Sequence, residues 1–297
     1  MKRNFSKRFT IALTSTLLAL SAAATAVSGF AWFTASNLVK VSGMNIQAEA
    51  EEGIVVANET HAANDDWSDN ITASHDGTGN TFVPTSTATT ATWYHGLAAK
   101  FDDGQEDESV QVITPVDNIA ANDPAPAYGT ADDGIYGFFD GLNWKSVYLL
   151  NSFYIRSSSA SALTGQDIFV RDFQAKVGEN APAQDLSKGL RVAVVKHGQT
   201  NPVIVAPVDG ADLTYDVGIA TSKEVTDFTV TAGSATTNSS SLVVDSNVTI
   251  PATNANALQY DVFIYFEGED ENVKSSNLEA SLEELSVQFK FGNKSHQ

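Results

Sequence analysis

The chain has 297 residues, of which 42% are hydrophobic and 18% charged, and its 36 acidic against 17 basic residues give a formal net charge of −19. Binding to a phosphate backbone requires clustered Lys and Arg that displace counterions, so this charge balance argues against nucleic acid as a partner. The absence of cysteine excludes disulfides, thiolate zinc sites, iron–sulfur clusters and cysteine nucleophiles.

The first residues have the layout of a secretory signal peptide. A basic stretch that includes Lys7 and Arg8 precedes an uncharged stretch, residues 9–27, that is rich in Leu and Ala. A retained membrane anchor is the alternative, but several Thr and Ser residues interrupt the stretch, which is marginal against the roughly 20 apolar residues that a spanning helix needs. We therefore expect an N-terminal signal helix, contact with the membrane only during export, and a secreted, extracellular protein.

Small residues offer two cleavage positions, after Ala26 or after Ala31. Cleavage after Ala31 makes residues 1–31 the signal peptide and residues 32–297 the mature β-sandwich domain. It removes basic residues and no acidic ones, so the mature chain is more acidic still. Such a surface repels anionic membranes and copies of itself except at specific contacts.

Beyond residue 35, apolar and polar residues alternate with many β-branched and aromatic side chains, a pattern typical of half-buried strands. Turn-forming clusters separate these stretches, and helical periodicity is almost absent, which predicts an all-β antiparallel sandwich. Predicted strands lie at residues 44–48, 54–56, 110–113, 147–155, 168–170, 192–194, 203–205, 228–230, 248–250, 258–266 and 285–291.

Three segments differ from this pattern. Residues 277–284 predict a short helix, because Leu278 and Leu282 are spaced four apart behind a capping-box pattern. Residues 58–135 contain a Thr-rich run and an acidic run with too little apolar surface to fold alone, so we expect a loop-rich acidic insertion; a second small domain is the alternative. Residues 231–241 are rich in Ser and Thr and predict a surface loop.

The chain contains none of the common catalytic or metal-binding motifs. Its five histidines show no HExxH spacing, and there is no GxSxG elbow, phosphate-binding loop or EF-hand pattern. We therefore expect no catalytic residues, no metal site, no cofactor and no enzyme activity. Acidic loops could still bind Ca²⁺ through carboxylate oxygens, although solvated acids are the commoner explanation in so acidic a chain.

Large apolar side chains follow the expected cleavage position. Water disfavours them on a free terminus, so they must be buried. One interpretation is that they form the first strand of their own sandwich; the other is that they add as a strand to the next subunit and produce a head-to-tail homopolymer. The residues concerned are Trp32, Phe33, Leu38, Val39, Val41, Met44 and Ile46.

Residues 28–34, with the sequence SGFAWFT, resemble the N-terminal signature of the TasA/CalY (camelysin) family, and residues 285–291 resemble its closing strand. Residues 149–155 and 260–268 are similar to segments of exported relatives with the same signal. The resemblance implies a jelly-roll-like β-sandwich, cleavage after Ala31 by a SipW-type signal peptidase, and extracellular fibres that assemble by donor-strand exchange from Trp32 onward. The metalloprotease activity described for camelysins is not carried over, because this chain has no zinc-binding motif.

We therefore expect a non-catalytic structural subunit of a cell-surface or biofilm-matrix fibre. The alternative is a monomeric surface binding module for Ca²⁺ or carbohydrate, in which Trp67, Trp93, Tyr94 and Trp144 stack on sugar rings. A hydrolase built from scattered His and Asp residues has the least support, since no spacing favours it.

Overall fold

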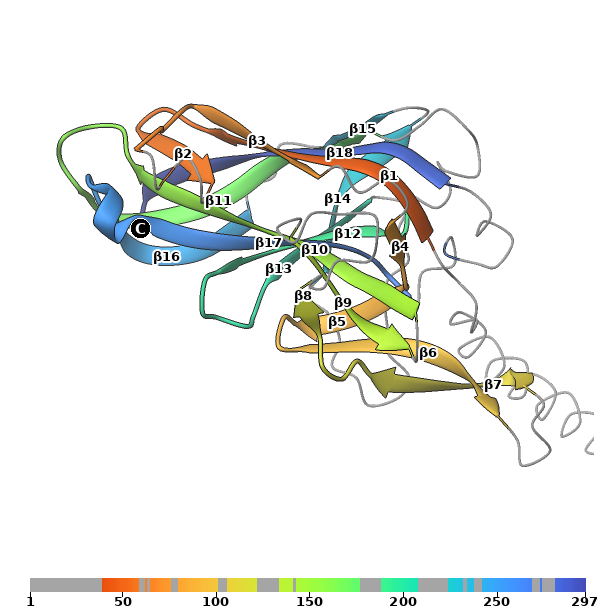
Figure 1. The fold of residues 1–297 in the computed structure, drawn as a ribbon. Coiled ribbons are helices and arrows are strands. Elements are labelled where there is room, and N and C mark those ends of the chain that lie inside the picture. Colours follow the sequence, from red (N-terminus) through yellow and green to blue (C-terminus); the bar gives the residue numbers. More distant parts are fainter. Residues whose placement is uncertain are drawn as a thin grey trace, which may run out of the picture.

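The computed structural model of the chain describes residues 39–58, 62, 65–75, 80–100, 106–121, 134–140, 143–176, 188–207, 224–231, 234–237, 242–268, 273 and 281–297. Over these residues the protein is built almost entirely from strands (Figure 1). They are β1 (Val39–Ala50), β2 (Ile54–Asn58), β3 (Asn70–His75), β4 (Asn80–Phe82), β5 (Thr85–Thr89), β6 (Thr92–Lys100), β7 (Glu106–Pro115), β8 (Ala120–Ala121), β9 (Ile135–Asp140), β10 (Asn143–Ser157), β11 (Leu163–Lys176), β12 (Leu190–Lys196), β13 (Val203–Pro207), β14 (Glu224–Thr231), β15 (Ser234–Thr237), β16 (Leu242–Ile250), β17 (Leu258–Phe266) and β18 (Ser281–Ser295), with a 3-10 helix η1 (Asn254–Asn256).

The strands form one continuous 15-stranded sheet and a separate 3-stranded sheet. The large sheet folds over at the short strand β4, where Phe82 is in register with Val39 of β1 on one side and Ser146 of β10 on the other. One half, which we call the first sheet, has the order β3-β1-β18-β11-β16; the other half, the second sheet, has the order β10-β17-β12-β13-β14-β15, with β2 and β9 on the outer edge of β10. We call β5-β6-β7 the small sheet.

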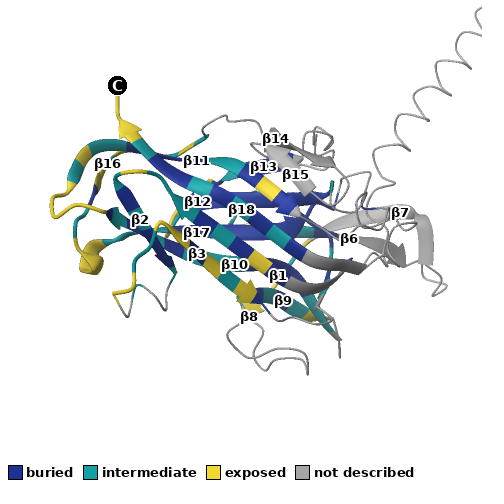
Figure 2. Ribbon diagram, turned by 90° about the horizontal axis from the view of Figure 1, so that it is seen from above, coloured by how far each residue is buried: buried dark blue, intermediate teal, exposed yellow. Residues whose placement is uncertain are grey.

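The two halves face each other as a sandwich. Phe153 on β10 lies 5.8 Å, between ring centroids, from Phe289 on β18, and Tyr260 on β17 lies 5.7 Å from Phe291. Along β1 the buried Met44, Ile46 and Ala48 alternate with polar residues, as Figure 2 shows by colour. This alternation buries one side of β1. The predicted all-β sandwich and the positions of the predicted strands are confirmed. The prediction that the sandwich is antiparallel is corrected in part, because β1 pairs parallel to β18 and β13 parallel to β14.

A third layer lies on the outer side of the second sheet, where Trp93 of β6 is 2% exposed. The centroid of its indole lies 4.6 Å from that of Tyr148 on β10 and 4.9 Å from that of Tyr265 on β17. Strand β5 continues this junction, because Thr85 forms a bridge with Glu267 and the side chains of Thr85–Thr87 are buried. An aromatic cluster thus joins the small sheet to the sandwich.

Three expectations from the sequence need correction. The helix predicted at residues 277–284 is wrong for residues 281–284, which begin β18; there the parallel pairing with residues 40–42 outweighs a weak local helix preference. The described part of residues 58–135 is not loop-rich, since it forms β3 to β8; β3, β4 and β8 belong to the large sheet and β5 to β7 form the small sheet. Residues 234–237 of the predicted loop form β15. The expected signal peptide, residues 1–31, lies outside the described residues.

Candidate functional site

Four residues expected to be donated to a neighbour lie on β1. Val39, Met44 and Ile46 are buried in the core between the two sheets, and Val41 pairs with Asn80 and Leu282. The other expected donor residues, Trp32, Phe33 and Leu38, and the cleavage position Ala31, lie outside the described residues.

Both edges of β1 are occupied within the same chain. On one edge, residues 40–50 pair with residues 281–291 of β18; on the other, residues 39–41 pair with β4 and residues 44–49 with β3. The prediction that Val39, Val41, Met44 and Ile46 pair with another molecule is therefore corrected: they form the first strand of their own sandwich. Pairing within one chain avoids the entropy cost of association, and the alternation of β1 matches its own core.

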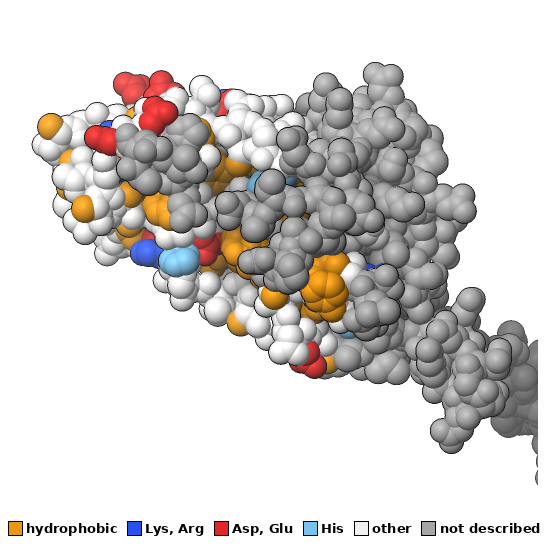
Figure 3. All heavy atoms as spheres, viewed as in Figure 1, with side chains coloured by type: hydrophobic (Ala, Val, Ile, Leu, Met, Phe, Trp, Pro, Cys, Tyr) orange, Lys and Arg blue, Asp and Glu red, His pale blue; other side chains and the backbone are white. Residues whose placement is uncertain are grey.

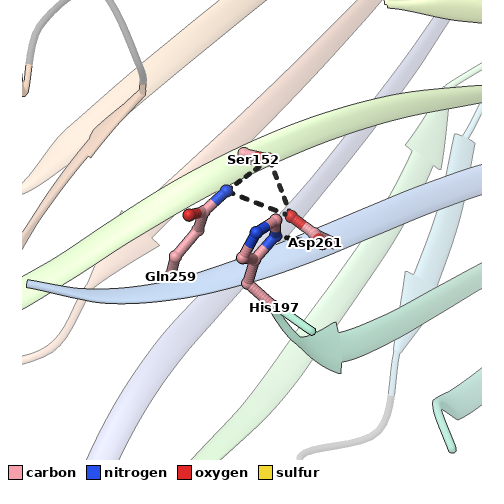
Figure 4. A network of polar contacts seen from close by, with 4 residues as sticks. All are labelled: Ser152, His197, Gln259 and Asp261. Carbon is pink, nitrogen blue, oxygen red and sulfur yellow. Dashed lines mark hydrogen bonds and ion pairs between the residues drawn. The ribbon is translucent and has the colours of Figure 1, made fainter. Parts of the chain in front are cut away.

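The most connected polar cluster on the second sheet centres on Asp261 of β17 (Figure 4). Its carboxylate accepts hydrogen bonds from the hydroxyl of Ser152 at 2.7 Å and from Nδ1 of His197 at 2.8 Å. The amide of Gln259 donates to Ser152 at 3.1 Å and reaches Asp261 at 3.5 Å. Only 12% of the Asp261 side chain is exposed, against 58% of the His197 side chain.

This cluster has the residue types of a hydrolase but not the geometry. In a catalytic triad the histidine bonds the serine and removes its proton. Here the carboxylate of Asp261 lies between Ser152 and His197, so the serine hydroxyl donates to the carboxylate and not to the histidine. The cluster instead holds the turn between β12 and β13, where the backbone N–H of His197 also donates to the carbonyl of Gln259 at 2.9 Å. Sequence reasoning missed the cluster, because no local pattern places Ser152 beside a residue 109 positions away.

Truncating the central carboxylate tests this structural role. We expect Asp261→Ala to lower the free energy of unfolding by about 1–3 kcal/mol, because partly buried donors on Ser152 and Gln259 lose their acceptor. Ser152→Ala, which removes a donor and leaves the carboxylate its other partners, should cost less, about 0.5–1.5 kcal/mol. Urea denaturation of the two variants measures the difference; equal losses would argue against Asp261 as the centre of the cluster.

A second Asp–His pair holds His296, which follows β18, against β11. Asp167, on β11, accepts hydrogen bonds through Oδ1 from Nδ1 of His296 at 2.6 Å and from the backbone N–H of Asn247 at 3.0 Å. Burial by itself raises the pKa of Asp167, but these two hydrogen bonds and the positive charges of His296 and Lys294 outweigh it, so the pKa lies below its ordinary value of 3.8. The charged form of Asp167 is the form that the fold favours.

This depressed pKa predicts a contribution to acid stability. Because the folded-state pKa of Asp167 is lower than the unfolded one, its stabilisation is present above pH 3.8 and is lost as the pH falls through the lower folded-state pKa. We expect the stability of Asp167→Asn to fall less than that of the wild type on acidification. Unfolding curves between about pH 2 and pH 6 measure this. Asp117→Asn, at an exposed aspartate, is the control and should track the wild type.

Three of the four aromatic residues considered for sugar stacking, Trp67, Trp93 and Trp144, pack against other side chains of the chain. The expectation that Trp93 stacks on a sugar ring is wrong, because this side chain is buried beneath the small sheet. The ring of Trp67 is covered by the guanidinium of Arg156, 4.9 Å from its centroid. Trp144 packs against Phe139, a 51% exposed ring whose centroid is 5.1 Å away. In Figure 3 the apolar side chains of the viewed face lie in several groups between polar ones.

Among the residues that the structure describes, no group of three or more His, Asp or Glu side chains is placed to hold a metal ion. Within the same residues, no helix has the length and apolar character needed to cross a membrane. Compared with known proteins, the chain matches no family model, no curated protein and no solved structure.

Proposed function

We propose that this protein is a secreted structural subunit of a cell-surface or biofilm-matrix fibre, related to the TasA/CalY proteins and cut after Ala31 by a SipW-type signal peptidase. Its body would be a jelly-roll-like variant of the sandwich, and it would assemble head to tail with copies of itself. Of the residues expected to be donated to the neighbour, the proposal keeps only those in residues 32–38, which precede β1.

One observation carries this proposal: β1 pairs on both of its edges with strands of its own chain, without residues 1–38. Strands β3, β4 and β18 supply every backbone partner of residues 39–50 that the structure describes. The pairing of β1 within its own chain therefore does not require the apolar residues Trp32, Phe33 and Leu38. Their burial on a neighbouring subunit would remove a large apolar area from water, and an extended segment can add to a sheet of that neighbour.

The roles of the two Asp–His pairs support a structural rather than a catalytic protein. His197 fixes a turn through Asp261, and His296 fixes the C-terminal end through Asp167. In each pair the imidazole is bound to a carboxylate that other donors already occupy, which is an arrangement that holds elements together.

The test compares two purified chains, one that begins at Trp32 and one that begins at Val39. We expect the longer chain to form fibres visible by electron microscopy and the shorter chain to stay monomeric. Because β1 is retained whole, the shorter chain should keep the circular dichroism spectrum of the longer one. A longer chain carrying Trp32→Ser and Phe33→Ser is the matched control for length, and it should also remain monomeric.

Two results would contradict the proposal. Fibres from the chain that begins at Val39 would show that residues 32–38 are not the donor. A chain from Trp32 that stays monomeric at high concentration, across pH and with Ca²⁺, would argue against fibre formation altogether. Calorimetry with Ca²⁺ and with glycans would then test the alternative of a monomeric binding module.

A further inference from the structure

The outward side of the first sheet carries an array of uncharged polar side chains, which we call the amide face. Cross-strand register sets them in rows: Gln47 is beside Thr72 on one side and Gln288 on the other, and Gln288 is beside Gln174. A second row runs alongside the first, from Ser74 through Asn45 to Ser286. The face comprises Asn45 and Gln47 on β1, Thr72 and Ser74 on β3, Gln174 on β11, and Ser286 and Gln288 on β18.

These side chains retain unused hydrogen-bonding capacity. Asn45, Thr72, Ser74 and Gln174 are exposed, and the others are half-buried. Apart from Gln288, whose amide donates to Glu49, none of them makes a side-chain hydrogen bond with the described residues. Figure 2 looks onto this face, and no described strand crosses over it. Each amide offers donors and an acceptor, and each hydroxyl offers both.

The charged side chains at one end of the face compensate one another. At one end Lys290 lies between Glu49, 3.3 Å away, and Asp172, 3.8 Å away, and Arg171 pairs with Glu51. The second row ends at Lys176, beside Ser286. The chain as a whole is strongly acidic, with a net charge of −19, and Figure 3 shows described acidic side chains gathered at the left end of the molecule.

We propose that the amide face is a lateral contact between two copies of this chain, a step that rests on the proposed fibre function. Two acidic copies repel each other over most of their surfaces, so a close approach is least opposed where the local charge is balanced. Amides and hydroxyls complement themselves, as a contact between two identical faces related by a two-fold axis requires. One such contact is weak, since neutral hydrogen bonds replace bonds to water. Repeated along a fibre, the contacts act together and bundle neighbouring fibres.

The test changes the charge of the face with little change of shape. The variant Asn45→Asp, Gln47→Glu, Gln174→Glu replaces three amides with carboxylates. The control variant Asn201→Asp, Gln199→Glu, Gln297→Glu also makes one Asn→Asp and two Gln→Glu changes, at exposed amides away from the face. Full-length mature chains are assembled, imaged by electron microscopy, and sedimented at low speed, which pellets bundles and leaves single fibres in the supernatant.

The wild type and the control variant should form bundles, and the face variant should form single fibres with at least a tenfold smaller bundled fraction. Added salt should restore part of the bundling, because it screens the introduced charges. Bundles that persist in the face variant would overturn the lateral contact and leave the fibre function standing. Single wild-type fibres that bind an insoluble neutral polysaccharide, when the face variant does not, would assign the face to a glycan. A wild type without fibres would overturn both proposals.

Discussion

A Phe289→Ala substitution should lower the free energy of unfolding by about 3–5 kcal/mol, because it removes a fully buried ring from the centre of the sandwich. Phe289 stacks on Phe173 with 5.4 Å between centroids and meets the edge of Phe153 from the opposite sheet at 5.8 Å. The loss would leave a cavity between the two layers. Thermal unfolding should show a midpoint lower by roughly 10 °C.

The chain offers a matched control for that substitution. Phe139→Ala removes the same ring from a position that is 51% exposed, so its cost should stay below about 1 kcal/mol. Comparable losses for the two variants would mean that the ring of Phe289 does not lie between the sheets, and the facing of β10 and β18 would need revision.

Trp93→Ala should release the small sheet from the sandwich. The Trp93 indole fills the junction between Tyr148 and Tyr265, and its Nε1–H donates to the carbonyl of Thr90 at 3.2 Å. We expect a local loss of about 3–5 kcal/mol. Hydrogen exchange should become faster in β5 to β7, while the amides of β1 and β18 stay protected, because the sandwich core does not include this residue.

The conservative variant Trp93→Phe tests whether faster exchange in the small sheet comes from lost ring packing at the junction. Trp93→Phe keeps a ring in the junction and should retain most of the protection in β6. If exchange in β1 and β18 rises together with exchange in β6, the three layers unfold as one unit, and the small sheet is not a separately opening part.

The strands were predictable because their signal is local. In residues 285–291 each second side chain is apolar, and the buried positions Leu285, Val287, Phe289 and Phe291 follow that alternation directly. The helix predicted just before them was wrong for residues 281–284. The leucine spacing is compatible with a helix, but the deciding factor was a partner strand more than 200 residues away in the sequence. Thr85–Thr87 were equally misleading, since polar residues are buried there by docking of the small sheet.

The candidate sites were harder to predict, because they depend on which strands become neighbours. Alternation identified Met44 and Ile46 as residues that must be buried, yet it could not state whether the partner strand belongs to the same chain. Asp261 and Ser152 have no unusual sequence context, and only the register of β10 against β17 sets them side by side. The same holds for the rows of the amide face, which combine four strands from distant parts of the chain.

The parallel pairing of β1 with β18 has a consequence for how the molecule is made. Strand β1 is synthesised long before its partner β18. At about 5–20 residues per second, the delay between them is on the order of tens of seconds. Throughout that interval Ile46 and its neighbours lack half of their sheet, and closing so long a loop is slow. A circular permutant joins the C-terminus to β1 through a linker long enough to run back along the sheet, because parallel neighbours need a crossover connection. Opened at an exposed turn, such as 198–201, it should refold faster than the natural order of strands.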